Sequence, residues 1–552
     1  MNIKDILGKI PFTAELLDAL RRDRPQTRYN LSQLEKALPA AVEQVCSLPI
    51  LKEIPGKGKR VVLFATLHYW VEQAAIIALI LRGLGYDVTI AYLPFGDWRK
   101  QVSSLDLRRQ DLYTQRVLAP LAGLVKSISL LAVKPASILS AKLADAIETV
   151  SAFDTMYTHQ VEEIDKSSAL YRLRLERNSQ AAKAAQTFLQ ADRPDVVIIP
   201  NGSITELGAV YQVSRHLGIK TVTYEFNDQR EQVWVAQNDE VMHQDTDALW
   251  EARGGQALSA EEREKIEGLE SARMGGRAFG KSMRQWQDVA AVGGKNIRAS
   301  LGLDARPVIL LATNVLGDSL TLGRNIFASS MAEWITKTVQ YFARQNTAQL
   351  VIRIHPGERL MHGQSMLDVI KSALPQLPEH IHVINPLEKI NTYDIMEITD
   401  LGLVYTTTTG MEMSMNAIPV IVCGKTHYRE RGFTFDPCSW EEYFATLERV
   451  LHGLEHDLAV GSSAPTDDLA AGRVPLKSPG SAHRLTQAQV DTAWEYAYRF
   501  FFEYPIPFPW RLMHFWKDLD VWPVGRVLSP EGIHEFGRTF GYLAGEMLDW
   551  KK

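Results

Sequence analysis

The sequence has few cysteines, no excess of basic residues and no long hydrophobic run, and each absence excludes a class of protein. Its three cysteines, Cys46, Cys423 and Cys438, are far apart and lack CxxC spacing, so they predict neither a disulfide framework nor a zinc site. This pattern fits a reducing compartment. The 60 Lys and Arg residues against 65 Asp and Glu residues give a formal net charge of −5, which argues against general nucleic-acid binding.

No segment has the composition of a signal peptide or of a membrane span. The first 25 residues carry charges throughout and contain no apolar segment of signal-peptide length. The most apolar region, residues 118–147, is interrupted by Lys126, Lys134 and Lys142, and it falls short of the roughly 20 apolar residues that a spanning helix needs. We therefore expect a cytoplasmic protein.

Apolar runs alternate with helical patterns along the chain, as they do in proteins with parallel sheets. An apolar run at 60–69, a helical pattern at 71–86 and a second run at 87–96 predict a β-α-β unit. The alternation returns at 178–226 and again at 306–424, and no GxGxxG fingerprint accompanies it. Because 552 residues exceed one ordinary core, we predict an α/β protein with two doubly wound, Rossmann-like domains that face a cleft.

Helical segments are expected around and within these domains. Residues 1–55 are predicted to form a helical lead-in that ends at a turn near Pro55. Residues 56–290 form the N-terminal domain, with a helical insertion at about 97–177, where the alternation breaks. Residues 291–465 form the C-terminal domain, and residues 466–552 begin with a Pro/Gly/Ser-rich stretch and continue as a helical tail that packs back on the domains.

Three predicted strands of the C-terminal domain end in polar residues. The motif His355-Pro356-Gly357-Glu358 follows one strand, the cluster Thr406–Thr409 follows the next, and Lys425 follows the third. In an open parallel sheet, ligands bind beyond the carboxyl ends of the strands, and a helix N-terminus there offers backbone N–H groups to an anion. The sequence therefore predicts a site for a phosphate-bearing molecule.

The order of these motifs is similar to that of a known family. HPGE after a buried strand is followed by NTYD, by four threonines and GME, by IPV, and by a glycine with Tyr428 and GFT. This series resembles the capsular polysaccharide biosynthesis family of GT-B glycosyltransferases, which are related to bacterial Kdo transferases and more distantly to bacterial sialyltransferases. The resemblance is clearest from Leu350 to Phe435, and a weaker one covers Pro194 to Phe226.

The resemblance implies that the C-terminal domain binds a nucleotide sugar. It places His355 and the threonine cluster on the donor phosphate and makes Glu412 a contact of the ribose or base. Elementary electrostatics adds Arg353 or Lys425 as a source of positive charge. The predicted donor-binding residues are Arg353, His355, Pro356, Glu358, Thr406, Thr407, Thr408, Thr409, Glu412 and Lys425.

Each of these residues also has a structural interpretation that the sequence leaves open. His355 could be held within its loop, the threonines could cap a helix, and Glu412 could favour a helix dipole. Glu358 could cap a helix or pair with Arg359. Which of the four threonines contacts the donor also stays open.

Sugar transfer further needs a base that takes the proton of the acceptor hydroxyl. We expect the base in the N-terminal domain, and we predict Glu206, which follows a buried strand and a loop at the start of a helix. Glu225 and Asp228 are rivals after the next strand, and His68 ends the first strand. No DxD-type pair of carboxylates stands in a suitable context, so we predict transfer without a metal or other cofactor.

The tail carries Trp510, Phe515, Trp516, Trp522 and Trp550 among basic residues. We expect closing helices, and a second interpretation is a contact with the inner face of a membrane, where a lipid-linked acceptor would lie. The predicted function is transfer of a sugar from a nucleotide-sugar donor to a glycan or lipid-linked glycan of the cell surface, of capsular or lipopolysaccharide type. Alternatives are a CDP-glycerol-type glycerophosphotransferase and a non-catalytic polysaccharide-assembly protein with the same fold.

Overall fold

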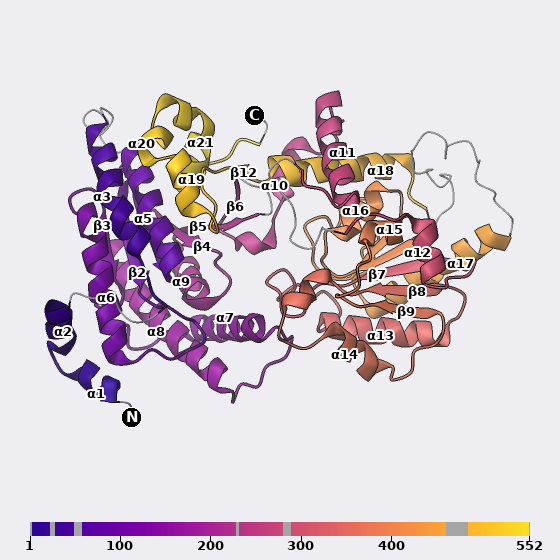
Figure 1. Cartoon of the computed structure of the whole chain (residues 1–552), viewed down its shortest axis with the longest axis horizontal. Coiled ribbons are helices and arrows are strands. Elements are labelled where there is room, and N and C mark those ends of the chain that lie inside the picture. The colour runs from indigo at the N-terminus through magenta and orange to yellow at the C-terminus, as the bar shows by residue number, and fades with distance from the viewer. Residues whose placement is uncertain are drawn as a thin grey trace. The chain divides into compact units, whose positions relative to one another are not determined.

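The computed structural model describes residues 3–21, 28–48, 58–227, 231–279, 289–459 and 484–550 (Figure 1). The chain forms two compact units. Unit 1 comprises Met1–Thr158, Ile164–Gln244 and Pro505–Asp549, and unit 2 comprises His159–Glu163, Asp245–Tyr504 and Trp550–Lys552. The predicted turn at Pro55, the rival base Asp228 and most of the Pro/Gly/Ser-rich stretch after Pro465 lie outside the described residues.

Unit 1 is built on a seven-stranded sheet with the order β12-β6-β5-β4-β1-β2-β3. Its parallel strands are β1 (Arg60–Thr66), β2 (Asp87–Leu93), β3 (Lys126–Ser129), β4 (Val196–Pro200) and β5 (Lys220–Phe226). β6 (Gln232–Gln237) and β12 (Ile506–Pro507) add two antiparallel pairings at one edge. The chain moves outward from β1 on one side and then from β4 on the other, which is the doubly wound arrangement.

The helices of unit 1 lie between and around these strands. They are α1 (Ile3–Lys9), α2 (Thr13–Arg21), α3 (Ser32–Ser47), α5 (His68–Gly83), α6 (Ser104–Leu118), α7 (Ala141–His159), α8 (Ala169–Asp192), α9 (Thr205–His216), α19 (Phe515–Val521), α20 (Val524–Val527) and α21 (Pro530–Leu543). α5 is apolar on nearly every side and is buried from Trp70 to Leu81, because it lies between the sheet and outer helices.

Part of the predicted helical insertion at 97–177 has a different structure. α6 and β3 continue the regular alternation, since β3 pairs in parallel with β2 from Thr89 to Tyr92. The sequence of β3, Lys-Ser-Ile-Ser, is short and polar because the strand lies at the edge of the sheet and exposes its first two residues. An apolar-run criterion therefore misses this strand. α7 and α8 occupy the remainder of the segment.

Unit 2 contains a five-stranded parallel sheet with the order β11-β10-β7-β8-β9. The strands are β7 (Val308–Ala312), β8 (Gln349–Arg353), β9 (Ile381–Ile384), β10 (Leu401–Val404) and β11 (Val420–Val422). β7, β8 and β10 are buried at every position, which explains their continuous apolar runs. The strand orders of the two units confirm the predicted α/β fold with two Rossmann-like domains.

The helices of unit 2 cover its sheet and extend beyond it. They are α10 (Asp247–Arg253), α11 (Ala260–Met274), α12 (Gly294–Ser300), α13 (Met331–Arg344), α14 (Met366–Ala373), α15 (Thr392–Met396), α16 (Thr409–Met415), α17 (Trp440–Ala459) and α18 (Gln487–Tyr498). α13 and α14 lie together along one side of the sheet (Figure 1). They share one core with α17, in which Trp334, Ile370 and Leu447 are buried.

The C-terminal tail is divided between the units. α18 belongs to unit 2, whereas β12 and α19–α21 belong to unit 1. Trp510 is fully buried and donates its indole N–H to the carbonyl of Trp522 at 2.9 Å. Phe515 and Phe540 are buried in the same core. These tail aromatics stabilise unit 1 through packing, as expected of closing helices.

Candidate functional site

The polar strand ends of unit 2 meet where the strand order reverses. β7 lies between β8 and β10, and the chain runs outward from β7 first through β8 and β9 and later through β10 and β11. Doubly wound sheets bind ligands beyond the carboxyl ends of the strands at this switch point. His355 follows β8, and the threonine cluster follows β10. The sheet therefore brings both predicted motifs to one edge, on either side of β7.

The residues after β7 connect the two motifs. The hydroxyl of Thr313 accepts a hydrogen bond from the backbone N–H of His355 at 3.0 Å. The amide oxygen of Asn314 accepts one from the backbone N–H of Thr406 at 3.1 Å. Sequence reasoning overlooked this pair, although a strand that ends in Thr-Asn beside two polar strand ends is a detectable signal.

The ring of His355 is oriented by its own loop. Its Nδ1 accepts a hydrogen bond from the backbone N–H of Gly357 at 3.0 Å, at the start of a short 3₁₀ turn. An accepting Nδ1 carries no proton, so a neutral ring holds its proton on Nε2. The structural interpretation of His355 and a donor role at Nε2 are thus compatible in one side chain.

The four threonines differ in their contacts. The hydroxyl of Thr407 donates to that of Thr409 at 3.1 Å and accepts from the backbone N–H of Thr409 at 3.3 Å, which secures the start of α16. The hydroxyl of Thr406 is buried and has no hydrogen-bond partner among the described residues. Thr406 is therefore the better candidate for a ligand contact, because the Thr407 hydroxyl is already hydrogen-bonded to Thr409.

Two glycines let the threonine loop pack closely. A Cβ on Gly410 would lie 2.4 Å from the hydroxyl of Tyr428, and that hydroxyl donates to the carbonyl of Thr407 at 2.6 Å. A Cβ on Gly424 would lie 2.9 Å from both the Thr406 methyl group and the Tyr405 carbonyl. Only glycine fits at these two positions, which links both residues to the shape of the loop.

Three other predicted donor-binding residues have their own contacts. Arg353 is buried, and its guanidinium donates to the carbonyls of Asn385 at 2.8 Å and Ile390 at 3.1 Å. Burial lowers the pKa of Arg353 to about 10. Glu358 accepts from the N–H of Met366 at 2.9 Å, so it caps α14, and burial raises its pKa. Lys425 is exposed. Contact of these residues with a donor stays a prediction.

Glu412 is buried in an ion pair. Its carboxylate lies 2.7 Å from Nη1 of Arg273 on α11 and accepts from the hydroxyl of Tyr393 at 2.9 Å. Neither partner could be identified from the pattern around Glu412, because they lie 139 and 19 residues away in the sequence. These contacts explain the position of Glu412 without a ligand, and the predicted contact with a nucleotide stays a prediction.

The NTYD motif fastens the segment that precedes β7. Asn391 donates its amide N–H groups to the carbonyls of Met274 and Val289 at 2.9 and 3.0 Å. Asp394 accepts from the backbone N–H groups of Val292 and Gly293 at 2.8 and 3.0 Å. Part of this motif is therefore structural.

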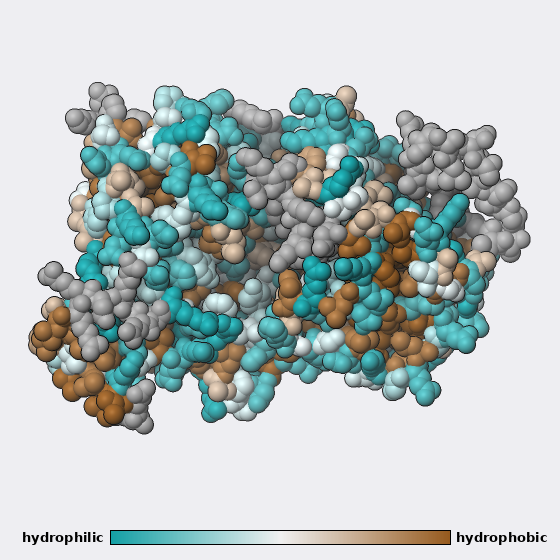
Figure 2. All heavy atoms as spheres, viewed as in Figure 1, coloured by the Kyte–Doolittle hydropathy of each residue, from teal (hydrophilic) through white to brown (hydrophobic). Residues whose placement is uncertain are grey.

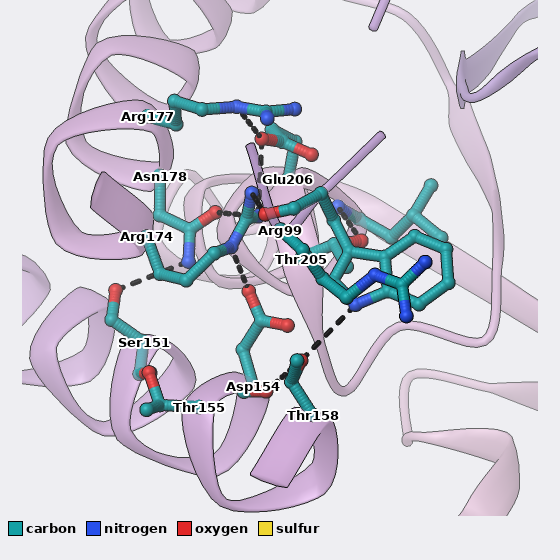
Figure 3. A network of polar contacts seen from close by, with 12 residues as sticks. Arg99, Ser151, Asp154, Thr155, Thr158, Arg174, Arg177, Asn178, Thr205 and Glu206 are labelled. Carbon is teal, nitrogen blue, oxygen red and sulfur yellow. Dashed lines mark hydrogen bonds and ion pairs between the residues drawn. The ribbon is translucent and has the colours of Figure 1, made fainter. Parts of the chain in front are cut away.

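In unit 1, Glu206 lies inside a buried network of charged residues (Figure 3). Arg174 of α8 donates to Glu206 at 3.1 Å and is also paired with Asp154 of α7, and all three side chains are fully buried. Nε of Arg177 lies 2.8 Å from the same Glu206 oxygen. Two carboxylates thus balance two guanidinium groups between α7, α8 and α9.

The charge state of this network follows from its pairs. Burial tends to raise the pKa of Glu206, but the positive charges of Arg174 and Arg177 outweigh it and leave the pKa below its ordinary value. Burial lowers the pKa of Arg177 to about 10. A general base works best when its pKa is near the working pH and its oxygen reaches the substrate. The contacts of Glu206 favour a structural role, and its catalytic role stays a prediction.

The switch point of unit 1 carries a second set of polar residues. β1, β4 and β5 are neighbours in the sheet; His68 and Asn201 closely follow β1 and β4, and Glu225 is the penultimate residue of β5. The amide of Asn201 donates to Glu225 at 3.1 Å, and burial raises the pKa of Glu225. Burial lowers the pKa of His68, whose Nδ1 has no hydrogen-bond partner among the described residues.

The loops at this edge have strained backbones. Leu67 before α5, Asn201 after β4 and Thr205 at the start of α9 have φ values of 62°, 58° and 57°. A positive φ is unusual for a non-glycine residue and is a genuine outlier for a β-branched one such as threonine. Strain of this kind gathers at functional sites. Two of the strained residues are next to the rival bases: Leu67 precedes His68, and Asn201 donates to Glu225.

A segment of unit 2 is similar in sequence to a known protein family. Residues 276–445 match the model of the family described as "Capsule polysaccharide biosynthesis protein". Residues 276–445 are thus similar in sequence to this capsule polysaccharide biosynthesis family. This segment includes all five strands of the second sheet, His355 and the threonine cluster, so the predicted resemblance is confirmed there. The capsule-family segment is less than half of the 552-residue chain.

Solved structures that resemble the chain include sugar-processing proteins. A β-Kdo 2,4 transferase, KpsC of Thermosulfurimonas dismutans, is 18% identical over 44% of this chain and 74% of that chain, with a TM-score of 0.31. The UDP-GlcNAc 2-epimerase of Neisseria meningitidis is 12% identical over 72% and 92%, with a TM-score of 0.24. Likenesses this weak identify no substrate. No curated protein matches the chain in sequence.

Among the residues that the structure describes, no group of three or more His, Cys, Asp or Glu residues is arranged to hold a metal ion. None of the helices seen in the structure is both long enough and apolar enough to cross a membrane.

Proposed function

We propose that the protein is a glycosyltransferase that moves a sugar from a nucleotide-sugar donor to a growing cell-surface glycan of capsular or lipopolysaccharide type. One observation carries most of this proposal. Within the capsule-family segment, Thr313 and Asn314 tie His355 and Thr406 to the switch point of the sheet. A doubly wound sheet binds ligands at that position.

The chemistry of the proposal assigns one role to each group in unit 2. When the acceptor oxygen attacks the anomeric carbon, the bond between that carbon and the phosphate oxygen breaks, and negative charge develops on the nucleotide phosphate. His355 would donate from Nε2 to this phosphate, because its Nδ1 already accepts from Gly357. The hydroxyl of Thr406 and the N–H groups at the start of α16 would add further donors.

Unit 1 would supply the base. The sequence favours Glu206, but its ion pairs with Arg174 and Arg177 favour Glu225 for this step. Glu225 is half-buried, lies at the end of β5 and has a raised pKa, so it is a better proton acceptor near neutral pH. The proton of the acceptor hydroxyl would move to the Glu225 carboxylate as the new glycosidic bond forms.

The test is nucleotide release from a panel of CMP-, UDP-, GDP- and CDP-linked donors, compared between wild type and His355→Asn. The asparagine side chain offers an acceptor near the position of Nδ1, so the contact with Gly357 is retained while the Nε2 donor is lost. We expect turnover of a nucleotide-linked sugar and a decrease in kcat of about 100-fold or more in the variant. Thermal unfolding should change little.

Other outcomes of the same assay would contradict the proposal. Unchanged turnover in His355→Asn would remove His355 from the mechanism. Turnover of CDP-glycerol alone would assign the chain to glycerophosphate transfer, and glycan binding with no nucleotide release would assign it to a non-catalytic role. Metal independence is also part of the proposal: full activity should persist in excess EDTA, and activity that is lost and then restored by Mg²⁺ would contradict it.

A further inference from the structure

The three central strands of the unit 2 sheet end at the same level. Ala312, the last residue of β7, is in register with Arg353, the last residue of β8, and with Val404, the last residue of β10. Neighbouring strands of a sheet lie about 4.8 Å apart. Residues that stand equally far beyond this level on the three chains are therefore expected to be close neighbours.

Two residues beyond this level the chains carry Asn314, His355 and Thr406, which we call the switch-point row. Asn314 is its middle member, because β7 lies between β8 and β10. Hydrogen bonds hold the row together. The side chain of Asn314 accepts from the backbone N–H of Thr406, and the hydroxyl of the adjacent Thr313 accepts from that of His355. A ligand that contacts both His355 and Thr406 therefore has Asn314 as its neighbour.

The amide of Asn314 is oriented by its bond to Thr406. A backbone N–H can only donate, so the atom that it meets at 3.1 Å is the amide oxygen, Oδ1. The amide group is planar, and its nitrogen, Nδ2, consequently points away from the Thr406 backbone. One half of the side chain thus serves the loop, and the other half is directed elsewhere.

The Nδ2 half has no hydrogen-bond partner among the described residues, although Asn314 is only 9% exposed. Buried amide groups in folded proteins are nearly always paired with protein or with an ordered small molecule. Nδ2 is not completely buried, so a small molecule can reach it. The position combines an enclosed side chain with an open donor, as a ligand-binding amide requires.

The surroundings of Asn314 give no second reason for an amide at this position. Thr313, Val315 and Leu316 are buried, so the chain after β7 is not an ordinary surface loop. Val315 packs toward the HPGE motif, where a Cβ on Gly357 would lie 3.7 Å from its methyl group. The Thr406 N–H needs only an acceptor, which an aspartate would supply equally well. Only the N–H groups on Nδ2 distinguish asparagine from aspartate here.

We propose that Asn314 is a further donor-binding residue, whose Nδ2 donates a hydrogen bond to a phosphate oxygen of the nucleotide-sugar donor. The inference rests on the proposed function, which supplies the ligand. An N–H group can only donate, so its ligand must be an acceptor, and phosphate oxygens are strong acceptors. The middle of the switch-point row places Asn314 beside His355, which the proposed function assigns to the same phosphate.

The experiment is calorimetric titration of the full chain with CMP, UDP, GDP and CDP. The test variant is Asn314→Asp, which keeps an oxygen for the Thr406 N–H, removes the Nδ2 donor and sets a negative charge beside the phosphate. We expect the Kd of the bound nucleotide to rise about tenfold or more. The matched control is Asn346→Asp, which makes the same change at an exposed residue near the amino end of β8. It should bind as wild type does.

A second variant, Asn314→Ala, separates a ligand contact from a purely positioning role. It removes both the contact with Thr406 and the Nδ2 donor, so we expect it to weaken nucleotide binding as well. Weaker binding by Asn314→Ala with wild-type binding by Asn314→Asp would show that Asn314 only positions Thr406, and would overturn the proposal. Thermal unfolding checks that both variants fold. If Asn314→Asp does not fold, wild-type affinity in Asn314→Ala overturns the proposal.

Two further outcomes separate this proposal from the proposed function. Tighter binding by Asn314→Asp would mean that position 314 faces a ligand hydroxyl, which can donate to a carboxylate, and would overturn the phosphate contact alone. A wild type that binds none of the four nucleotides would contradict the proposed function, and the contact would fall with it.

Discussion

Glu206 occupies a position that suits a catalytic base, but its buried ion pairs with Arg174 and Arg177 favour a structural role. It stands at the start of a helix after a buried strand, as an acceptor-side base would. Two arginines of α8 pair with it in the fold, and one of them also pairs with Asp154 of α7 (Figure 3). Removal of one member of a buried ion pair leaves an uncompensated charge, which is strongly destabilising.

Because their environments differ, replacement of Glu206 and replacement of Glu225 should have different effects on stability and on kcat. Glu206→Gln leaves the buried guanidinium groups of Arg174 and Arg177 with one carboxylate, so we expect the free energy of unfolding to fall by about 3–5 kcal/mol in urea titrations. Glu225→Gln should lower kcat by about 100-fold or more with little change in stability. A Glu206→Gln variant that is stable but inactive would restore Glu206 as the base.

At the scale of elements, the shape of the loop between β10 and α16 depends on a close contact with Tyr428, for which Gly410 leaves room. The Tyr428 hydroxyl donates to the backbone carbonyl of Thr407. Gly410 is so close to this hydroxyl that a Cβ at position 410 would clash with it. A tight polar contact of this kind positions the threonine hydroxyls relative to the His355 loop. The element therefore depends on a residue without a side chain as well as on the threonines.

Gly410→Ala should displace this loop. Its Cβ would lie 2.4 Å from the Tyr428 hydroxyl, so either the tyrosine or α16 must move. We expect a loss of about 1–3 kcal/mol in the free energy of unfolding and a higher KM for the donor. Tyr428→Phe is the matched control, because it removes the hydrogen bond to Thr407 without adding volume. A Gly410→Ala variant with unchanged KM would show that the loop does not position the donor.

At the scale of the whole molecule, stability should depend on pH through buried carboxyls. Glu270 of α11 is buried, accepts from Asn416 at 2.5 Å and lies near Glu412, Glu267 and Arg273. Burial, opposed by the Asn416 contact, raises its pKa from 4.5 to about 7. The folded state therefore holds a proton that the unfolded state releases near pH 4.5, and stability falls as pH rises between these two values.

The expected change is measurable against Glu270→Gln. A pKa raised from 4.5 to about 7 corresponds to a loss of about 3 kcal/mol in the free energy of unfolding by pH 8 relative to pH 4. Glu72 in unit 1 has a similarly raised pKa, so the difference between wild type and Glu270→Gln isolates the Glu270 contribution. The variant should decline less between pH 5 and pH 8 in urea titrations. Parallel curves would contradict the raised pKa.

The sequence by itself determined the buried parallel strands of both sheets and the positions of the HPGE motif and the threonine cluster at strand ends. Strands such as β1, β7 and β8 are buried on both faces, so their apolar runs are local signals that need no partner to be recognised. His355 and Thr406–Thr409 follow such runs directly, and the carboxyl ends of parallel strands meet at one edge. The order of strands then follows from the doubly wound rule.

Only the tertiary structure decided which polar residues pair with one another and which helix side faces solvent. Arg273 and Glu412 are 139 residues apart, and Arg174 and Glu206 are 32 apart, so neither pair leaves a local pattern. The polar edge strand β3 and the apolar side that α1 and α2 expose (Figure 2) likewise depend on neighbours from distant segments. A buried charge needs a partner of opposite sign to offset its loss of hydration, and the packing of the whole unit determines which residue lies close enough to be that partner.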